Sequence, residues 1–313
     1  MSPGAFGLEI VSESGLPGLT APGGVAAARL AEHRVVGREA LAPWLAQEPL
    51  RTIGRDGKGA LRVEYLQGSS GAVLVRTRSF GDHLIADGGR AILSVVAGVD
   101  RELWQRYVLG QVLLLTASLQ GLEIFHASAV AIGGAVVVLA GPSGAGKSSL
   151  AAALIGIGGA RFFADDVLAL DPTPFELVGY PGPALINVPR ERLASLPPGL
   201  LAGPAWSDAD PGKVLLPVRG ERRALPILAF FRLSPDEEQS GVRFEPCLPD
   251  RLMATTFDGV SRTPARQLRL LRVGAMLAAQ ARAEEVRYRS GADPEAVATA
   301  LLERLRGAGA GTG

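Results

Sequence analysis

The sequence predicts an α/β fold, and three observations carry this prediction. An apolar run, Ala135–Ala140, is followed by a glycine-rich loop and then by small residues with helical character. A further strand candidate runs from Arg161 into Asp165-Asp166, so that strand, loop, helix and strand lie within about forty residues. Two amphipathic patterns, Arg266–Arg282 and Asp293–Arg306, predict helices that close the domain.

The N-terminal part shows weaker patterns. Short helices are expected at Val25–His33 and Arg38–Ala46. Brief β-like runs separated by glycines follow, at Leu61–Leu66, Ala72–Arg78 and His83–Ala86. Asp100 then caps a longer helix, in which apolar residues recur at spacings of three and four until Gly121. Residues 1–120 are therefore expected to form a smaller α+β region, a candidate for docking a substrate or partner.

The remaining strands are expected in a second domain, residues 121–306. Ile124–Ile132 reads as a strand, and Gly133-Gly134 as the two-residue turn that joins it to the apolar run. Further strand candidates are Val167–Leu170, Leu185–Val188 and Leu225–Arg232, the last two separated by the proline-rich stretch Pro197–Pro217. These strands predict a mixed sheet flanked by helices. Residues 307–313 are expected to be a disordered tail.

The composition excludes several classes of function. The 313 residues are enough for a large buried core. The 32 basic and 31 acidic residues balance to a formal charge of +1, which gives no support for a nucleic-acid groove or for disorder. A single cysteine, Cys247, excludes an internal disulfide framework and a multi-thiolate metal site. No signal peptide or bilayer-spanning stretch is visible. We therefore expect a soluble, cytoplasmic protein without nucleic-acid or membrane partners, as a possible homo-oligomer.

The glycine-rich loop carries the clearest chemical signal. It reads Gly141-Pro142-Ser143-Gly144-Ala145-Gly146-Lys147-Ser148, and Ser149 follows it. This matches the Walker A pattern, in which backbone N–H groups at a helix N-terminus surround phosphate oxygens. Lys147 would contact the β- and γ-phosphates of ATP, and the Ser148 hydroxyl would bind Mg²⁺. The alternative is a strand-to-helix turn without a ligand, and the flanking strand and helix favour nucleotide binding.

Other candidate residues lie around this loop. Asp165 and Asp166 end a strand, where ligands of α/β sheets collect, and adjacent residues of an extended chain point in opposite directions. One carboxylate can thus reach a metal and the other an incoming hydroxyl, whereas the alternative is a surface turn. His126 on its own is more often a packed core residue. Lys213 follows a glycine and is either a cation for the transferring phosphoryl group or an exposed loop lysine.

Four segments together resemble the HPr kinase/phosphorylase family. They are Phe125-His126-Ala-Ser-Ala-Val, the glycine-rich loop, Phe163-Ala164-Asp165-Asp166 and Leu185-Ile186-Asn187-Val188. The spacings also resemble that family, with 21 residues from His126 to Lys147 and 18 from Lys147 to Asp165. The resemblance covers about 65 residues. The family's metal-binding glutamate has no counterpart at Gly179–Gly182, where Glu176 is the nearest carboxylate.

The resemblance implies the C-terminal kinase fold of that family and an ATP- and Mg²⁺-dependent serine kinase. It also implies that His126 is catalytic and interacts with Asp165, which acts as general base on an acceptor serine. Ser148 and Asp166 then hold the metal. The chain looks most similar to divergent members found with peptide-modification systems, including those for lasso peptides, so the expected partner is a peptide or small protein with an acceptor serine. Two alternatives stay open: a nucleotide-gated switch without transferase activity, and a kinase for a small molecule such as free serine.

Overall fold

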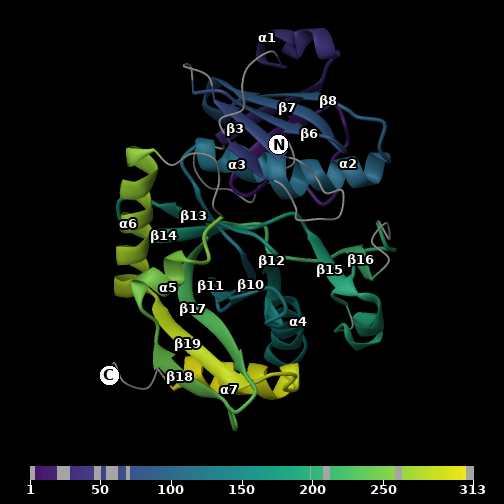
Figure 1. Cartoon of the computed structure of the whole chain (residues 1–313). Helices are drawn as coiled ribbons and strands as arrows, with labels where there is room; N and C mark the ends of the chain where they lie inside the picture. Colours follow the sequence, from purple (N-terminus) through teal and green to yellow (C-terminus); the bar gives the residue numbers. More distant parts are fainter. Residues whose placement is uncertain are drawn as a thin grey trace. The chain divides into compact units, whose positions relative to one another are not determined.

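The computed structural model describes residues 4–19, 29–45, 51–53, 63–67, 71–197, 199–206, 212–257 and 263–307. The protein is a mixed α/β protein, as the sequence predicts at this level. It divides into two compact units (Figure 1). The first consists of Met1–Leu122 and Asp258–Arg266, and the second of Glu123–Phe257 and Gln267–Gly313.

The first unit is built on a sheet that has eight strands within the described ranges, in the order β1-β2-β3-β8-β7-β6-β5-β4. The strands are β1 (Gly4–Ala5), β2 (Leu8–Ser12), β3 (Arg29–Val35), β4 (Arg51–Ile53), β5 (Val63–Gln67), β6 (Val73–Thr77), β7 (Gly81–Ala86) and β8 (Ala91–Val95). Short helices are the 3₁₀ turns Arg38–Leu41 and Asp87–Gly89 and helix α1 (Ala42–Leu45).

The long helix predicted after Asp100 is present as three joined parts. These are α2 (Arg101–Tyr107), a π-helical turn (Val108–Val112) and α3 (Leu113–Leu119). The Asp100 carboxylate accepts hydrogen bonds from two backbone N–H groups of the first turn, which is the expected N-cap. Trp104 of this helix lies near two buried histidines, with ring centroids 5.7 Å from His33 and 6.4 Å from His83.

The helix predicted at Val25–His33 is wrong in its described part. Arg29–His33 belongs to strand β3, and residues 25–28 lie outside the described ranges. Side chains along β3 alternate between buried (Ala31, His33) and exposed (Leu30, Glu32), which is the period of a strand. The neighbouring prediction, Arg38–Ala46, is confirmed as far as Leu45 by a 3₁₀ turn and α1.

The second unit holds a mixed sheet with nine strands in the part of the chain that is described. Its main path is β12-β10-β11-β17-β14-β13-β9, with β19 beside β17 and β18 beside β19. The strands are β9 (Glu123–Phe125), β10 (Ala127–Ile132), β11 (Ala135–Ala140), β12 (Arg161–Ala164), β13 (Leu168–Pro172), β14 (Leu177–Tyr180), β17 (Leu225–Asp236), β18 (Arg243–Pro246) and β19 (Arg282–Arg289). β11 and β19 run parallel to β17, whereas the other pairs are antiparallel.

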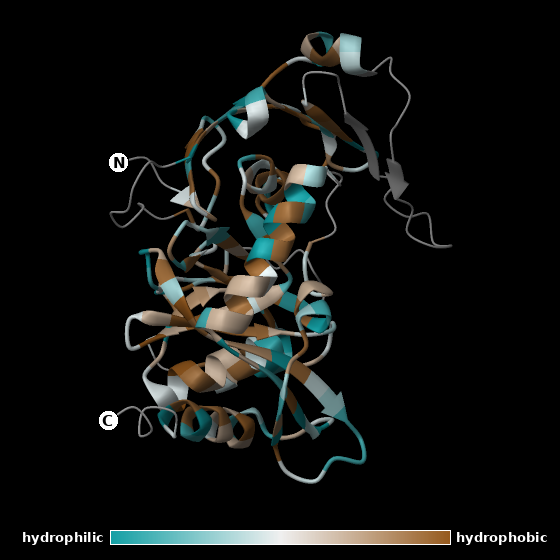
Figure 2. Cartoon of the chain, turned by 90° about the vertical axis from the view of Figure 1, so that its left-hand side faces the viewer, coloured by the Kyte–Doolittle hydropathy of each residue, from teal (hydrophilic) through white to brown (hydrophobic). Residues whose placement is uncertain are grey.

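Helices cover both faces of this sheet (Figure 1). Helices α4 (Lys147–Gly158) and α7 (Pro294–Arg306) pack on one face. Helix α5 (Pro249–Met253) and the greater part of α6 (Pro264–Gln280) pack on the other. Figure 2 shows hydrophilic and hydrophobic residues alternating along the helix near the C-terminus, the amphipathic pattern that predicts α7. A separate pair, β15 (Leu185–Pro189) and β16 (Lys213–Pro217), joins a smaller core with Phe162.

Several strands differ from their predictions for identifiable reasons. The single strand expected at Ile124–Ile132 is interrupted at His126, because β9 pairs with β13 whereas β10 pairs with β11 and β12. β16 lies inside the proline-rich stretch that was predicted only as a separator. β19 was missed because it is rich in charge; its Glu284 and Glu285 are buried and satisfied by arginine partners. The predicted tail after Gly307 lies outside the described residues.

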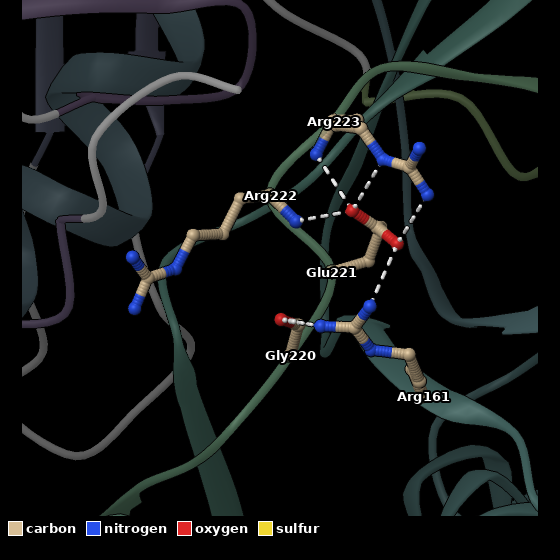
Figure 3. A network of polar contacts seen from close by, with 5 residues as sticks. All are labelled: Arg161, Gly220, Glu221, Arg222 and Arg223. Carbon is tan, nitrogen blue, oxygen red and sulfur yellow. Dashed lines mark hydrogen bonds and ion pairs between the residues drawn. The ribbon is translucent and has the colours of Figure 1, made fainter.

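A buried carboxylate anchors the beginning of β12, the strand that leads to Asp165 (Figure 3). The Glu221 side chain is only 6% exposed and lies 3.2 Å from Nη1 of Arg161, while Arg161 Nη2 also donates to the Gly220 carbonyl. The Arg223 guanidinium and the backbone N–H groups of Arg222 and Arg223 donate to the same carboxylate. The Arg222 side chain points away from it in Figure 3. Residues around position 221 therefore hold the first residue of β12.

The Glu221→Gln variant is expected to lower the free energy of unfolding by about 1–2 kcal/mol at pH 7. The Arg223 hydrogen bond, with further help from its neighbours, lowers the pKa of Glu221 to about 2. A lowered pKa stabilises the fold above the unfolded pKa of about 4.3, and this contribution disappears as the pH falls towards 2. Urea unfolding of wild type and variant at pH 7 and pH 3 measures it. The exposed Glu191→Gln is the control; a Glu221→Gln deficit that does not shrink at pH 3 contradicts the assignment.

Candidate functional site

A tight hairpin brings His126 to the glycine-rich loop. β10 and β11 are joined by Gly133-Gly134, whose φ angles of 59° and 83° lie in the region that favours glycine. The register pairs Ala127 with Ala140, so the residues one step beyond, His126 and Gly141, are neighbours at the open end of the hairpin. The pairing of β10 with β11 therefore brings His126 close to the loop in space, although the two are separated in sequence.

The loop itself has the backbone of an anion-binding turn. Gly141, Gly144 and Gly146 have φ angles of 151°, 84° and 79°. A Cβ at Gly141 would lie 2.8 Å from the Leu233 carbonyl oxygen, so only glycine fits there. The Tyr288 hydroxyl donates a hydrogen bond to the Ala145 carbonyl and ties the loop to β19. Because the loop leads directly into the N-terminus of α4, its backbone N–H groups are available to phosphate oxygens.

Lys147 lies under the loop and is 8% exposed. Its Nζ donates to the carbonyls of Gly141 and Pro142 at 3.0 and 3.1 Å, and lies 3.2 Å from His126 Nε2. Burial lowers the pKa of Lys147, while the charges of Asp166 and Asp165 oppose that shift. The ammonium group is thus held within the loop, and none of the described carboxylates forms a direct ion pair with it. A phosphate group at the loop would supply the missing negative charge.

His126 connects Lys147 to Asp166. Its Nε2 faces the ammonium group, and its Nδ1 lies 3.3 Å from Asp166 Oδ1. Since the ammonium group can only donate, Nε2 accepts, and a neutral imidazole then carries its proton on Nδ1 towards Asp166. The backbone N–H of His126 donates to the Thr255 carbonyl at 2.8 Å. This hydrogen bond fixes the backbone of His126 at the break between β9 and β10.

Asp165 is held by three neutral donors. The hydroxyls of Ser148 and Ser128 donate to Oδ1 at 2.6 and 2.8 Å, and the Asn187 backbone N–H donates to Oδ2 at 3.0 Å. The pairing of Ala129 with Ala164 in β10 and β12 explains the Ser128 contact, because it places Ser128 opposite Asp165. Burial raises the pKa of Asp165, although these hydrogen bonds lower it. The carboxylate is therefore well oriented and would be stabilised by a cation.

Asp166 is the opposite case. Its side chain is 71% exposed, and its φ of 68° is in the left-handed region that non-glycine residues rarely adopt. This backbone bend turns the side chain towards His126. The contacts expected from the sequence are therefore exchanged: His126 meets Asp166 and not Asp165, and Ser148 meets Asp165 and not Asp166.

Lys213 begins a strand and does not lie in the flexible loop that the sequence suggests. It is the first residue of β16, opposite Pro189, and it is exposed. Its positive charge contributes to the lowered pKa of Lys147. By contrast, Glu176 lies in an exposed turn, where its backbone N–H and carbonyl both pair with the Thr173 hydroxyl.

Gly179, in the segment where the resemblance would place a metal-binding glutamate, is closely packed. A Cβ there would lie 3.0 Å from the Ile227 side chain, inside the sheet. Sequence reasoning missed Ser128 as a site residue, and its position in β10, two residues after His126, was the available signal. It also did not single out Asn187, whose buried side-chain oxygen has no hydrogen-bond partner among the described residues.

A metal-binding cluster and a membrane-spanning helix are both absent from the residues that the structure describes. No group of three or more His, Cys, Asp or Glu side chains there could hold a metal ion by itself. Mg²⁺ at phosphoryl-transfer sites is usually bound by one or two protein carboxylates together with substrate phosphates and water, so this does not conflict with the Ser148–Asp165 pair. Among the same residues, no helix is long and apolar enough to cross a membrane.

Comparisons with known proteins add little to this geometry. No protein-family model matches the sequence, and no curated protein matches it. One similar solved structure is that of the Hpr(Ser) kinase/phosphatase from Coxiella burnetii, at 17% sequence identity. The comparison covers 59% of this chain and 93% of that chain, with a TM-score of 0.28. A likeness with this TM-score does not support a functional assignment, so the assignment depends on the site itself.

Proposed function

We propose that this protein is an ATP-dependent kinase that transfers the γ-phosphoryl group to a serine hydroxyl of a peptide or small protein. One observation carries the proposal: a glycine-rich loop of the Walker A pattern lies beside two adjacent carboxylates that have separate partners. Asp165 is paired with the loop serine, Ser148, and Asp166 is paired with His126. A nucleotide-binding switch needs the first pair, whereas the second pair supplies a base for an acceptor.

The residues of the loop fit a triphosphate with Mg²⁺. Lys147 and the N–H groups of the loop would hold the phosphates, as the lysine moves from the loop carbonyls to phosphate oxygens. Ser148 and Asp165 provide the oxygen ligands that Mg²⁺ prefers. Burial raises the pKa of Asp165, and a bound cation would favour its charged form. When bound, Mg²⁺ neutralises charge on the transferring phosphoryl group.

The His126–Asp166 pair fits the role of proton acceptor. The exposed Asp166 carboxylate would take the proton of the acceptor hydroxyl as its oxygen forms a bond to the γ-phosphorus. The bond from that phosphorus to the β-γ bridging oxygen breaks, and ADP leaves with the bonding electrons. The Nδ1–H of His126 orients Asp166, while Lys147 and Lys213 offset the charge of the phosphates.

Two observations support a peptide or protein acceptor over free serine. The Asp166 side chain is 71% exposed, which leaves room for an acceptor attached to a chain. The four sequence segments that resemble the HPr kinase family also suggest a serine in a peptide or protein, and they include His126, Lys147, Ser148, Asp165 and Asp166.

The test is transfer of labelled phosphate from ATP to candidate serine peptides, with free serine in parallel. Lys147→Ala is expected to reduce transfer at least about 10³-fold, because the loop loses its only side-chain cation. The exposed Arg306→Ala, at the end of α7, is the matched control and should retain wild-type activity. Tight ATP binding without transfer to any acceptor would favour the switch, and transfer to free serine alone would favour a small-molecule kinase.

A further inference from the structure

A pocket opens on the outer side of α4, next to the phosphate loop. It has an empty volume of about 580 Å³. Its lining comes from α4, β15, the 3₁₀ turn Arg190–Ser195 and the first residues of α7. Ser148 and Ser149 lie at one end of this lining, and Asp293 and Glu295 belong to it as well.

The pocket meets the phosphate loop at one end only. It is lined by Ser148 and Ser149, but by neither His126 nor Asp166. Acceptor chemistry would take place at His126, 3.2 Å from Lys147. A triphosphate with its γ-phosphate there must therefore leave the loop in another direction, and the lining residues Ser148 and Ser149 mark the exit. We infer that this pocket binds the nucleoside part of the triphosphate; the inference rests on the proposed function.

The chemistry of the walls fits a nucleoside better than a second anion. Ala152, Ala153, Ile186, Val188 and Leu196 form an apolar surface on which a base can pack. At the rim, Asp293 and Glu295 offer carboxylate oxygens to the ribose hydroxyls or to an amino group of the base.

These two carboxylates outnumber Arg192, the one basic residue in the pocket's described lining, so the lining disfavours a phosphate or an acidic peptide. Asp293 already caps α7 by accepting the Glu295 backbone N–H at 3.2 Å, so the exposed Glu295 side chain is the more available of the two. A nucleoside is therefore the occupant that the pocket's charge favours.

Two neighbouring residues allow a matched test. Ser195 lines the pocket, whereas Ala194 does not, and both are exposed on the same 3₁₀ turn. The Kd values of wild type, Ser195→Trp and Ala194→Trp would be measured calorimetrically for ATP and for inorganic tripolyphosphate, each with Mg²⁺. Wild type is expected to bind ATP at least about tenfold more tightly than tripolyphosphate. Ser195→Trp should bind ATP about tenfold more weakly than wild type, and tripolyphosphate less than about twofold more weakly. Ala194→Trp should bind both ligands with wild-type affinity.

A second filling variant, Ala153→Phe, tests the pocket from the α4 side and should show the same selective loss, with thermal melting to confirm its fold. Equal affinity of wild type for ATP and tripolyphosphate would overturn the inference while leaving phosphate binding intact. The inference would also be overturned if Ser195→Trp lost affinity for ATP and tripolyphosphate equally, or if it lost affinity for neither. If wild type binds neither ligand, the proposed function fails together with the inference.

Discussion

Replacing Asp166 with Asn is expected to lower the turnover of phosphoryl transfer by about 10²–10⁴-fold while ATP affinity stays near the wild-type value. The exposed carboxylate lies 3.3 Å from His126 Nδ1 and has no contact with Ser148, so its loss removes a base and leaves the phosphate loop unchanged. An amide has nearly the same shape and cannot accept the proton. Steady-state kinetics with a peptide acceptor, together with ATP binding, measures both quantities.

Asp165→Asn is the matched comparison, because it makes the same change one residue away. Asp165 binds the Ser148 hydroxyl at 2.6 Å, so the expected defect is in Mg²⁺ and nucleotide binding. The variant should need a higher Mg²⁺ concentration for half-maximal activity, whereas Asp166→Asn should not. Reversed results, with a Mg²⁺ requirement that rises only in Asp166→Asn, would restore the roles that the sequence resemblance implies.

The first unit is expected to lose stability steeply below pH 6. His33 and His83 are buried, and both bond to the Ser94 hydroxyl, at 3.0 and 2.8 Å. Burial lowers the pKa of His33 to about 4 and that of His83 to about 3. In the unfolded chain the histidine pKa is about 6.5, so unfolded molecules bind protons at pH values where the folded unit does not. The free energy of unfolding therefore decreases as the pH is lowered from about 6.5 towards 4 and 3.

The effect is large because two groups act together. Each contributes a slope of up to about 1.4 kcal/mol per pH unit, hence about 2.7 for both, against a typical total stability of 5–15 kcal/mol. Urea unfolding of wild type and His83→Leu at pH 7, 6 and 5 should show about half the pH dependence in the variant. The half-exposed His126→Leu serves as the control. Parallel pH curves for wild type and His83→Leu would show that His83 carries none of this effect.

Local sequence patterns predicted the secondary structure correctly where it depends on residues that are close in sequence. The turn Gly133-Gly134 predicts the β10–β11 hairpin, and counting back along its register brings His126 to Gly141. Asp100 caps its helix as predicted. Strand β3 and strand β19 could not be read in the same way, because their exposed or charged residues are accommodated by partners far away in the sequence, such as Arg251 and Arg304 for Glu285 and Glu284.

By itself, the sequence determined the glycine-rich loop and its flanking strand and helix, and it pointed to His126, Asp165 and Asp166 as residues near the loop. These depend on the short-range demands of turns, glycines and strand alternation. Only the tertiary structure decided which aspartate meets which partner. The register of β12 against β10 places Asp165 beside Ser128 and Ser148, and the positive φ of Asp166 turns it to His126. Both depend on pairing between distant strands and on a backbone bend, which no local pattern of residues specifies.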